Sequence, residues 1–406
     1  MLGLLSHIRV LDLSRVLAGP WASQILADLG AEVIKVERPQ SGDDTRTWGP
    51  PYHKDVQGNE TGESGYFLAA NRGKRSITLD LSKAEAQDII RKLVKDCDVL
   101  LENFKVGTLE RLGLGYKELS AINPRLVFCS ITGFGQTGPR RAEPAYDFLV
   151  QAMGGMMSVT GKPYDEAGGG PQKVGLPIID MVTGVYAAVG VLAALSARDQ
   201  SGVGDHIDLA MLDVQVGLLA NQGMNYLLTG KTPQRHGNGH ANIMPQQVFK
   251  CLDGDVVLAV GNDLQFGKLC RALGRAELAT DPRFALNPER VRHRDLLLDI
   301  LRQEFSAYQR SEIAATLVQA GVPCGPINTI PEVFEEPQVQ HRQMLRHLPH
   351  PAGGTVPQIM NPLRFVRASA KSDSLPPALG QHTQEILSAI GIPAAEWDSL
   401  RQRGVI

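Results

Sequence analysis

The sequence predicts an α/β fold, in which a Rossmann-like large domain with a parallel sheet carries a smaller inserted α+β domain. In residues 1–135, short apolar runs alternate with amphipathic ones, which is the rhythm of strand–helix–strand units and of a largely parallel sheet. Beyond residue 231 the pattern changes to a hairpin followed by amphipathic helices, which indicates a second domain of different construction.

The large domain begins with strands and helices in alternation. Between its second and third strands lies a polar stretch, Glu37–Arg75, that is too long for a simple connector. Loops of this length at strand ends often carry the functional site. The strands are expected at Ile8–Leu13, Glu32–Val36, Ser76–Leu81, Val99–Phe104 and Arg125–Ile131, and the helices at Trp21–Leu29 and Lys83–Val94.

The second half of the chain is mainly helical from Tyr146 to Leu228, around a strand-like segment at Asp205–Met211. The expected later elements are a hairpin at Gln247–Lys250 and Val256–Val260, helices near Leu264–Leu273 and Arg294–Phe305, a strand or loop at Gly325–Ile330, a helix at Pro331–Val339, an extended stretch at His350–Gly380 and a helix near Thr383–Ala389. The expected domains are residues 1–200 (large domain), 201–224 (linker), 225–323 (small domain) and 324–406 (a return segment completing the large domain).

Composition excludes several classes of partner. The 406 residues hold 41 basic and 43 acidic side chains, a net charge of −2, so no global field attracts nucleic acid or an anionic membrane. The longest apolar run, Val182–Leu195, is interrupted by two glycines and falls short of a bilayer span. With no secretion signal visible at the start, we expect a cytoplasmic protein without a membrane partner.

Three segments resemble known nucleotide-, phosphate- or metal-binding motifs but match them poorly. Gly133–Gly138 matches a dinucleotide-binding fingerprint, but Pro139 follows where a helix should open. Gly230-Lys231-Thr232 resembles the end of a phosphate-binding loop but lacks the glycine required before it. His236 and His240 have metal-ligand spacing, but the glycines between them oppose a helix and favour a flexible loop. That loop offers backbone N–H groups that could cradle an anion.

Two nucleophile classes are also disfavoured. No G-x-S-x-G sequence occurs, so the nucleophile elbow of α/β-hydrolases is absent. The cysteines are scattered among apolar neighbours and are expected to be reduced core residues, although a catalytic thiol stays an alternative. They are Cys97, Cys129, Cys251, Cys270 and Cys324.

Asp180 is the strongest candidate nucleophile. It stands at the start of an apolar helical run, where an aspartate is most often an N-cap. Its neighbours Ile178, Ile179 and Met181 are apolar. We expect backbone donors at the helix start to hold the acid ionised in apolar surroundings, which suits a carboxylate nucleophile.

Taken together, motifs from Val10 to the C-terminus make the chain resemble the class III CoA-transferases. Each motif is weak alone, and the combination is specific. The segments that carry the likeness are Val10–Pro20, Leu29–Pro39, Gly42–Arg46, Asn71–Ser76, Glu102–Phe104, Ile131–Pro139, Tyr146-Asp147 and Asp180 with Thr183-Gly184.

The resemblance implies an interlocked homodimer, with no permanently bound cofactor and no metal, that uses a coenzyme A thioester as co-substrate. Asp180 would be the catalytic aspartate, forming an anhydride and then an aspartyl-CoA thioester. The loop of Gly237, Asn238 and Gly239 would stabilise oxyanions. The resemblance places the CoA-binding residues at Arg38, Lys74, Arg75, Asn103 and Phe104.

Within this family, the sequence most resembles the succinyl-CoA:glutarate transferase group, through the segments Gly42–Pro51 and Gly321–Asn328. A dicarboxylate acceptor needs a cation for its distal carboxylate, for which Arg15, Arg46 and Arg72 are the candidates. Leu17 replaces a glutamine of formyl-CoA transferases, which disfavours oxalate, and Tyr146 replaces the histidine of the related racemases. Other acceptors (itaconate, malate, citramalate, 3-hydroxy-3-methylglutarate), an acyl-CoA racemase or isomerase and a CoA-binding protein remain the alternatives.

Overall fold

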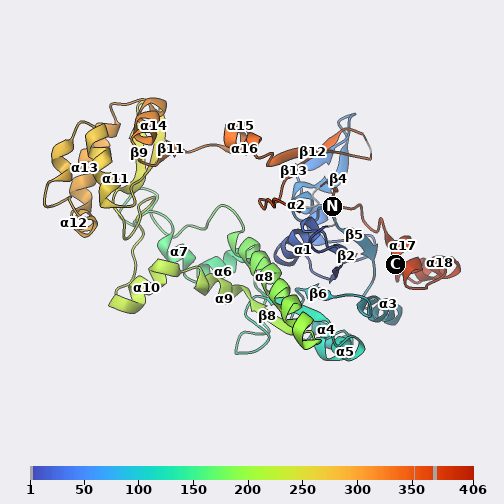
Figure 1. The fold of residues 1–406 in the computed structure, drawn as a ribbon. Helices are drawn as coiled ribbons and strands as arrows, with labels where there is room; N and C mark the ends of the chain where they lie inside the picture. The colour runs from blue at the N-terminus through green and yellow to red at the C-terminus, as the bar shows by residue number, and fades with distance from the viewer. Residues whose placement is uncertain (1–2, 352, 369–372) are drawn as a thin grey trace. The chain divides into compact units, whose positions relative to one another are not determined.

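The computed structural model describes residues 3–351, 353–368 and 373–406. The chain divides into two compact units (Figure 1). The first unit comprises Met1–Gly154, Gly175–Leu218 and Pro337–Ile406, and the second comprises Gly155–Val174 and Leu219–Glu336. The sequence-based boundaries differ from these in three places. Residues 155–174 and 324–336, both assigned to the large domain from the sequence, group with the second unit. The segment expected as a linker, residues 201–224, contains β8 (His206–Ala210), α9 (Met211–Gly217) and the start of α10 (Ala220–Thr229).

A parallel sheet of six strands forms the centre of the first unit, as the sequence predicts, in the order β5-β2-β1-β6-β7-β8. Each strand is short, and β1, β2, β6 and β7 are mostly buried, because helices cover parallel sheets on both faces. The register pairs Leu11 of β1 with Ile34 of β2 on one side and with Leu100 of β6 on the other. The strands are β1 (Arg9–Asp12), β2 (Glu32–Glu37), β5 (Arg75–Thr78), β6 (Val99–Glu102), β7 (Val127–Thr132) and β8 (His206–Ala210).

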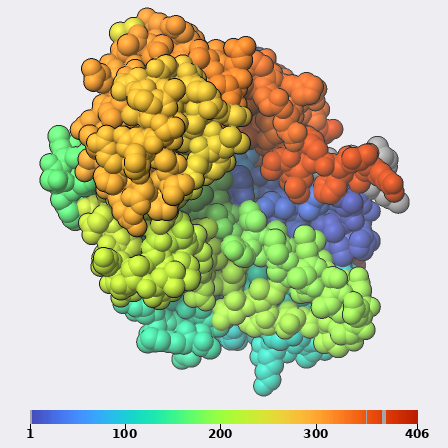
Figure 2. Space-filling view, turned by 60° about the vertical axis from the view of Figure 1, so that its left-hand side comes forward, coloured from blue at the N-terminus to red at the C-terminus, as the bar shows by residue number. Residues whose placement is uncertain are grey.

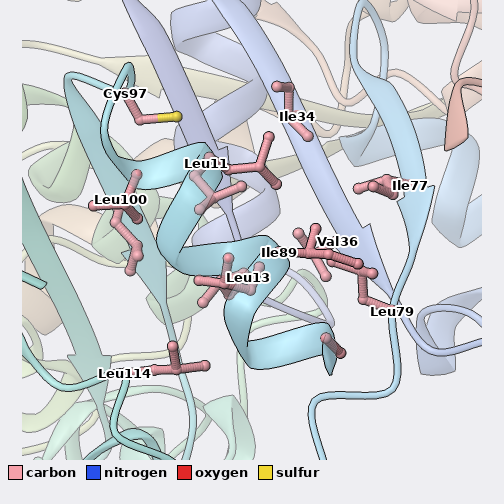
Figure 3. Packing of buried hydrophobic residues seen from close by; sticks show 14 of the residues in the cluster. Leu11, Leu13, Ile34, Val36, Ile77, Leu79, Ile89, Cys97, Leu100 and Leu114 are labelled. Carbon is pink, nitrogen blue, oxygen red and sulfur yellow. The ribbon is translucent and has the colours of Figure 1, made fainter. Parts of the chain in front are cut away.

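The helices of the first unit close its core. In α3 (Ala84–Val94), buried apolar residues recur at helical spacing, so one face of the helix packs on the sheet. Figure 3 shows Ile89 of this helix among Leu11, Val36 and Ile77 of the strands. The other helices are α1 (Ala18–Asp28), α2 (Gly65–Ala70), α4 (Thr108–Arg111), α5 (Tyr116–Ile122), α6 (Asp147–Met153), α8 (Ile178–Ser201), α9 (Met211–Gly217), α16 (Pro337–His341), α17 (Thr383–Ala389) and α18 (Ala394–Gln402).

The polar stretch Glu37–Arg75 contains ordered elements. They are η1 (Asp44–Thr47), β3 (Tyr52–Lys54), β4 (Glu60–Ser64) and α2, and Ser64 caps α2 by accepting from Phe67 N at 3.0 Å. A second hairpin pairs β12 (Leu345–Pro349) with β13 (Thr355–Ile359), and β13 lies within the stretch His350–Gly380 that was expected to be merely extended. Residues 352 and 369–372 of that stretch lie outside the described residues.

Helix α8 corrects the expectation that no apolar segment approaches the length of a bilayer span. It has 24 residues, and a window of it reaches a mean hydropathy of 2.0 with 39% of that window buried, so by length and composition it could cross a membrane. Core helices pass the same test, and α8 packs closely on α1. A Cβ added at Gly184 would lie 2.7 Å from Ala18 O, which explains the glycine there.

The second unit is built on an antiparallel sheet of three strands in the order β11-β10-β9. Phe249 and Phe305 stack in its core with ring centroids 4.6 Å apart. In Figure 2 its yellow and orange residues form one continuous mass. The helix expected at Pro331–Val339 is interrupted ahead of Pro337, which cannot continue a helix. The elements are β9 (Gln246–Cys251), β10 (Gly254–Ala259), β11 (Cys324–Pro326), α7 (Met156–Val159), α10 (Ala220–Thr229), α11 (Asp263–Ala272), η2 (Ala276–Ala279), α12 (Asn287–Arg292), α13 (Arg294–Phe305), α14 (Arg310–Gln319) and α15 (Ile330–Glu335).

Candidate active site

Asp180 lies in the first turn of α8, as the third residue of the helix. Pro177 occupies the N-cap position, so the alternative interpretation of Asp180 as the N-cap is wrong. The N–H groups of a first helical turn have no partner within the helix. Here Asp147, at the start of α6, supplies one: its Oδ2 accepts from Ile179 N at 2.7 Å and from Asp180 N at 3.2 Å. Asp147 therefore caps the helix that carries Asp180.

The Asp180 carboxyl is poorly stabilised as an anion. Burial, and then the nearby charge of Asp147, raise its pKa to about 7. The backbone donors that were expected to hold Asp180 ionised donate to Asp147 instead, and no other described residue donates a hydrogen bond to the Asp180 carboxyl. A carboxylate that is neither hydrogen-bonded nor fully solvated keeps its lone pairs available, which favours attack on an electrophilic carbon.

One aromatic residue of the polar stretch, Tyr66, is affected by these carboxyls, and a second, Trp48, packs against it. Burial and the negative charges of Asp180 and Asp147 raise the pKa of Tyr66, which places this α2 side chain in the same electrostatic environment. The edge of the Trp48 ring meets the Tyr66 ring with centroids 5.1 Å apart. Neither residue was predicted from the sequence, although the stretch that contains them was expected to carry the site.

A cavity of about 160 Å³ opens at the carboxyl ends of the central strands. Residues that end or follow β1, β2, β5 and β6 line it, and this edge of an open parallel sheet is where ligands generally bind. The lining residues are Leu13, Arg15, Lys35, Val36, Glu37, Arg38, Gly42, Asp43, Leu79, Asp80, Leu81, Ser82 and Phe104.

Four residues predicted for ligand binding come together at this cavity. The guanidinium of Arg15 lies over the Phe104 ring, 5.4 Å from its centroid. Asn103 fixes the Arg15 backbone, accepting from its N at 2.8 Å and donating to its O at 2.7 Å. Arg15 and Arg38 both pair with Asp44, and Arg38 is exposed. The cavity thus offers two cations and an aromatic face.

Lys74, also predicted to bind CoA, is placed differently. Its side chain is fully buried, and its Nζ donates to Asp12 at 3.2 Å and to Asn71 at 2.9 Å. Burial lowers the pKa of Lys74 to about 8. The neighbouring Lys35 pairs with Asp43 at 2.8 Å, with both side chains fully buried. Lys35 lines the cavity and Lys74 does not, and both lysines hold strand ends together through buried ion pairs.

The other predicted cations are engaged within the protein. Arg72 is buried and forms two hydrogen bonds to Asp28, at 2.9 and 2.7 Å. Arg46 binds both carboxylate oxygens of Glu37 and stacks on Phe67. The last three predicted residues do not line the cavity. Arg75 pairs with Glu32 and Glu385. Leu17 is buried as the N-cap of α1, and Tyr146 is 66% exposed beside Asp147.

The glycine loop of the second unit differs from the expected cradle of free donors. Gly237 N donates to Gly161 O at 3.0 Å, and Gly239 N donates to His236 O at 2.8 Å. The backbone amides of Gly237 and Gly239, on either side of Asn238, are therefore not free to donate to an oxyanion in this conformation.

The cysteine thiols are unsuited to nucleophilic chemistry. Cys97 and Cys129 are buried, and burial raises the pKa of each thiol to about 12. A thiol, rather than a thiolate, is present at neutral pH under these conditions, and it is a weak nucleophile.

Known proteins resemble this chain over nearly its whole length. The profile described as CoA-transferase family III matches residues 5–383. A succinate–glutarate CoA-transferase of Agrobacterium fabrum is 45% identical, with 95% of each chain covered. An acetyl-CoA:oxalate CoA-transferase of Acetobacter aceti is 43% identical over 83% of this chain and 84% of its own.

The fold is shared with a solved structure as well. The crystal structure of a CAIB/BAIF family protein from Brucella suis is 48% identical, with a TM-score of 0.81, covering 94% of this chain and 98% of its own. The family profile, the curated relatives and the shared fold agree, and they show that this chain belongs to CoA-transferase family III and is a class III CoA-transferase.

Proposed function

We propose that this enzyme moves CoA from succinyl-CoA to glutarate, or to a similar C4–C6 dicarboxylate, with Asp180 as the covalent nucleophile. The observation that carries the proposal is the setting of Asp180: an acid in a first helical turn, with raised pKa and no hydrogen bond to its carboxyl from any other described residue. The 45% identity to a relative named for succinate and glutarate supports the choice of acids.

The proposed reaction begins when an Asp180 carboxylate oxygen attacks the thioester carbon of succinyl-CoA. The C–S bond breaks, and CoA leaves as a thiolate from a mixed anhydride of succinate and Asp180. The thiolate then attacks the Asp180 carbonyl carbon, which expels succinate and leaves an aspartyl-CoA thioester. The enzyme now stores CoA on its own side chain.

The acceptor completes the cycle by the reverse steps. A carboxylate of glutarate attacks the aspartyl-CoA thioester, and CoA leaves again as a thiolate from a new mixed anhydride. The thiolate attacks the glutaryl carbonyl carbon, so glutaryl-CoA forms and the Asp180 carboxylate is regenerated. Tyr66 is the candidate donor to the oxyanions, since its hydroxyl keeps its proton near the two carboxyls.

We assign the CoA nucleotide to the cavity at the carboxyl ends of the strands. Arg38 is exposed there and suits a phosphate, and Phe104 offers a face for a base. For the distal carboxylate of the acceptor, Arg15 is the best of the three candidates. Its buried Nε has no partner among the described residues, whereas Arg46 and Arg72 are committed to Glu37 and Asp28.

A homodimer is part of the proposal. The family resemblance implies interlocked protomers, and α8 exposes the apolar side chains of Val185, Tyr186 and Val189 at 46%, 52% and 56%. Exposed apolar stripes of this kind are typical of surfaces that another chain covers.

The test of the proposed function is mass spectrometry of CoA esters after incubation with succinyl-CoA and single free acids. Glutarate is expected to yield glutaryl-CoA faster than itaconate, malate or oxalate do. A faster reaction with another acid would be consistent with the proposed mechanism but would contradict the assignment of glutarate as the acceptor. No acyl exchange with any acid, or exchange of an α-proton with deuterated water in the absence of free acid, would contradict the proposal.

The pH dependence of acylation should respond to Asp147. Because Asp147 raises the pKa of Asp180 by charge repulsion, Asp147→Asn removes that charge while its Oδ1 can still accept from the helix. We expect the rate of acylation by succinyl-CoA to rise with pH through about 7 in the native enzyme, and through a lower pH in the variant. Rapid acid quenching and mass spectrometry of the CoA adduct on Asp180 across a pH series measure both midpoints, and an unchanged midpoint would contradict the coupling.

A further inference from the structure

Two histidines and a glutamate converge in the first unit, on elements other than those that carry Asp180 and line the cavity. His53 lies on β3, Glu63 on the paired strand β4, and His350 directly after β12. Their ligand atoms all lie within 4.8 Å of one another. His350 Nε2 is 3.1 Å and His53 Nδ1 is 3.6 Å from the same oxygen, Oε2 of Glu63.

From this geometry we propose that His53, Glu63 and His350 form a binding site for a divalent transition metal, with Zn²⁺ as the best-fitting ion. Two imidazoles and one carboxylate are a common zinc ligand set, and imidazole disfavours Mg²⁺ and Ca²⁺. Around a tetrahedral zinc ion, neighbouring ligand atoms lie about 3.3 to 3.5 Å apart. The two distances from Glu63 bracket that spacing.

The surroundings of the three residues support a preformed metal-binding site. Side-chain exposures are 9% for His53, 11% for His350 and 19% for Glu63, so the cluster is enclosed but can be reached from solvent. The second ring nitrogen of His53, Nε2, lies 3.3 Å from the carbonyl oxygen of Thr355. Ligating histidines usually donate their other N–H to such an acceptor, which fixes the tautomer. Thr61 donates to Glu63 Oε2 at 2.9 Å and orients the carboxylate.

The site would join two hairpins that are distant in sequence. Glu63 and His53 belong to β3–β4, whereas His350 and Thr355 belong to β12–β13. Helix α2 begins at Gly65, directly after β4, and carries Tyr66. A bound ion would therefore fix the base of the helix that presents Tyr66 to the two carboxyls. The fourth coordination position would be taken by water.

The test is a titration of the full-length protein with Zn²⁺ alone, after chelator treatment, in competition with a chromophoric zinc indicator. One zinc ion per chain is expected. His53→Ala, Glu63→Gln and His350→Ala should each weaken zinc binding at least about tenfold. His347→Ala is the matched control, because His347 is exposed on the same hairpin and lies outside the cluster. Its zinc affinity should equal that of the native chain.

Two further readouts keep the proposal testable if a variant folds poorly. Glu63→Gln preserves the shape of the side chain, and circular dichroism checks its fold. Co²⁺ in place of Zn²⁺ should give the visible absorption of a tetrahedral site, which the three variants lose and His347→Ala retains. The proposal would be overturned if the chain bound no stoichiometric zinc, or if zinc binding survived all three substitutions. The three residues would then form only a hydrogen-bonded His–Glu–His cluster.

Discussion

Replacing Asp180 by alanine is expected to lower the rate of CoA exchange by about 10⁴-fold or more, the scale seen when a covalent nucleophile is removed. The neighbouring carboxylate, Asp147, is poorly suited to take over, because its Oδ2 accepts from two backbone N–H groups of α8. The rate of glutaryl-CoA formation from succinyl-CoA measures the loss. Residual exchange above a few per cent of the native rate would contradict the assignment.

Two controls separate loss of chemistry from loss of fold. Asp199→Ala changes an exposed aspartate near the end of the same helix and should leave exchange unaffected. Asp180→Asn should also be inactive, but more stable than the native chain above neutral pH. The folded-state pKa of Asp180 is raised to about 7, so its contribution to stability is complete below its unfolded pKa of about 3.9 and is lost as pH rises through 7. Thermal unfolding at pH 5 and pH 8 measures this.

The second large effect is expected from Asp43→Asn, which should lower the free energy of unfolding by about 3 to 5 kcal/mol. Asp43 pairs with Lys35 at 2.8 Å, and both side chains are fully buried. Without the carboxylate, the Lys35 ammonium stays buried and loses its closest counter-charge. Urea unfolding at pH 7 measures the loss, and a loss below about 1 kcal/mol, the range of surface pairs, would contradict the account.

The pH dependence of this effect has a definite sign. Interaction with Lys35 and hydrogen bonds from Thr45 outweigh burial and lower the pKa of Asp43 to about 2. A lowered pKa contributes stability that is complete above the unfolded pKa, about 3.9, and disappears as pH falls through 2. The difference in the free energy of unfolding between the native chain and Asp43→Asn should therefore shrink as pH falls from about 3.9 to about 2. Asp299→Asn, at the exposed pair with Arg302, is the control and should cost less than about 0.5 kcal/mol.

The sequence predicted the fold well where periodicity is strong. The strands and helices from Ile8 to Ile131 follow the alternation of short apolar runs, and the parallel sheet confirms it. The β12–β13 hairpin was missed because Pro349 and Pro357 stand inside strands that proline usually interrupts. The length of α8 was underestimated because its glycines were taken as interruptions, whereas Gly184 permits close packing on α1.

The site was predictable in part. Asp180 and the residues around the cavity stand in motifs that the sequence displays. The neighbours of Asp180 were not predictable, since Tyr66 and Asp147 reach it only through tertiary structure. A sequence cannot show which cations are free, and Arg46 and Arg72 are neutralised by partners from other elements. His53 and His350 likewise meet only through folding.

The central claim, that Asp180 carries CoA covalently, is tested most directly by mass spectrometry of the protein quenched in acid after mixing with succinyl-CoA. We predict a CoA adduct on the peptide that contains Asp180, which disappears when glutarate is added before quenching. An adduct on any other residue, or acyl exchange at the full rate with no adduct on that peptide, would contradict the account.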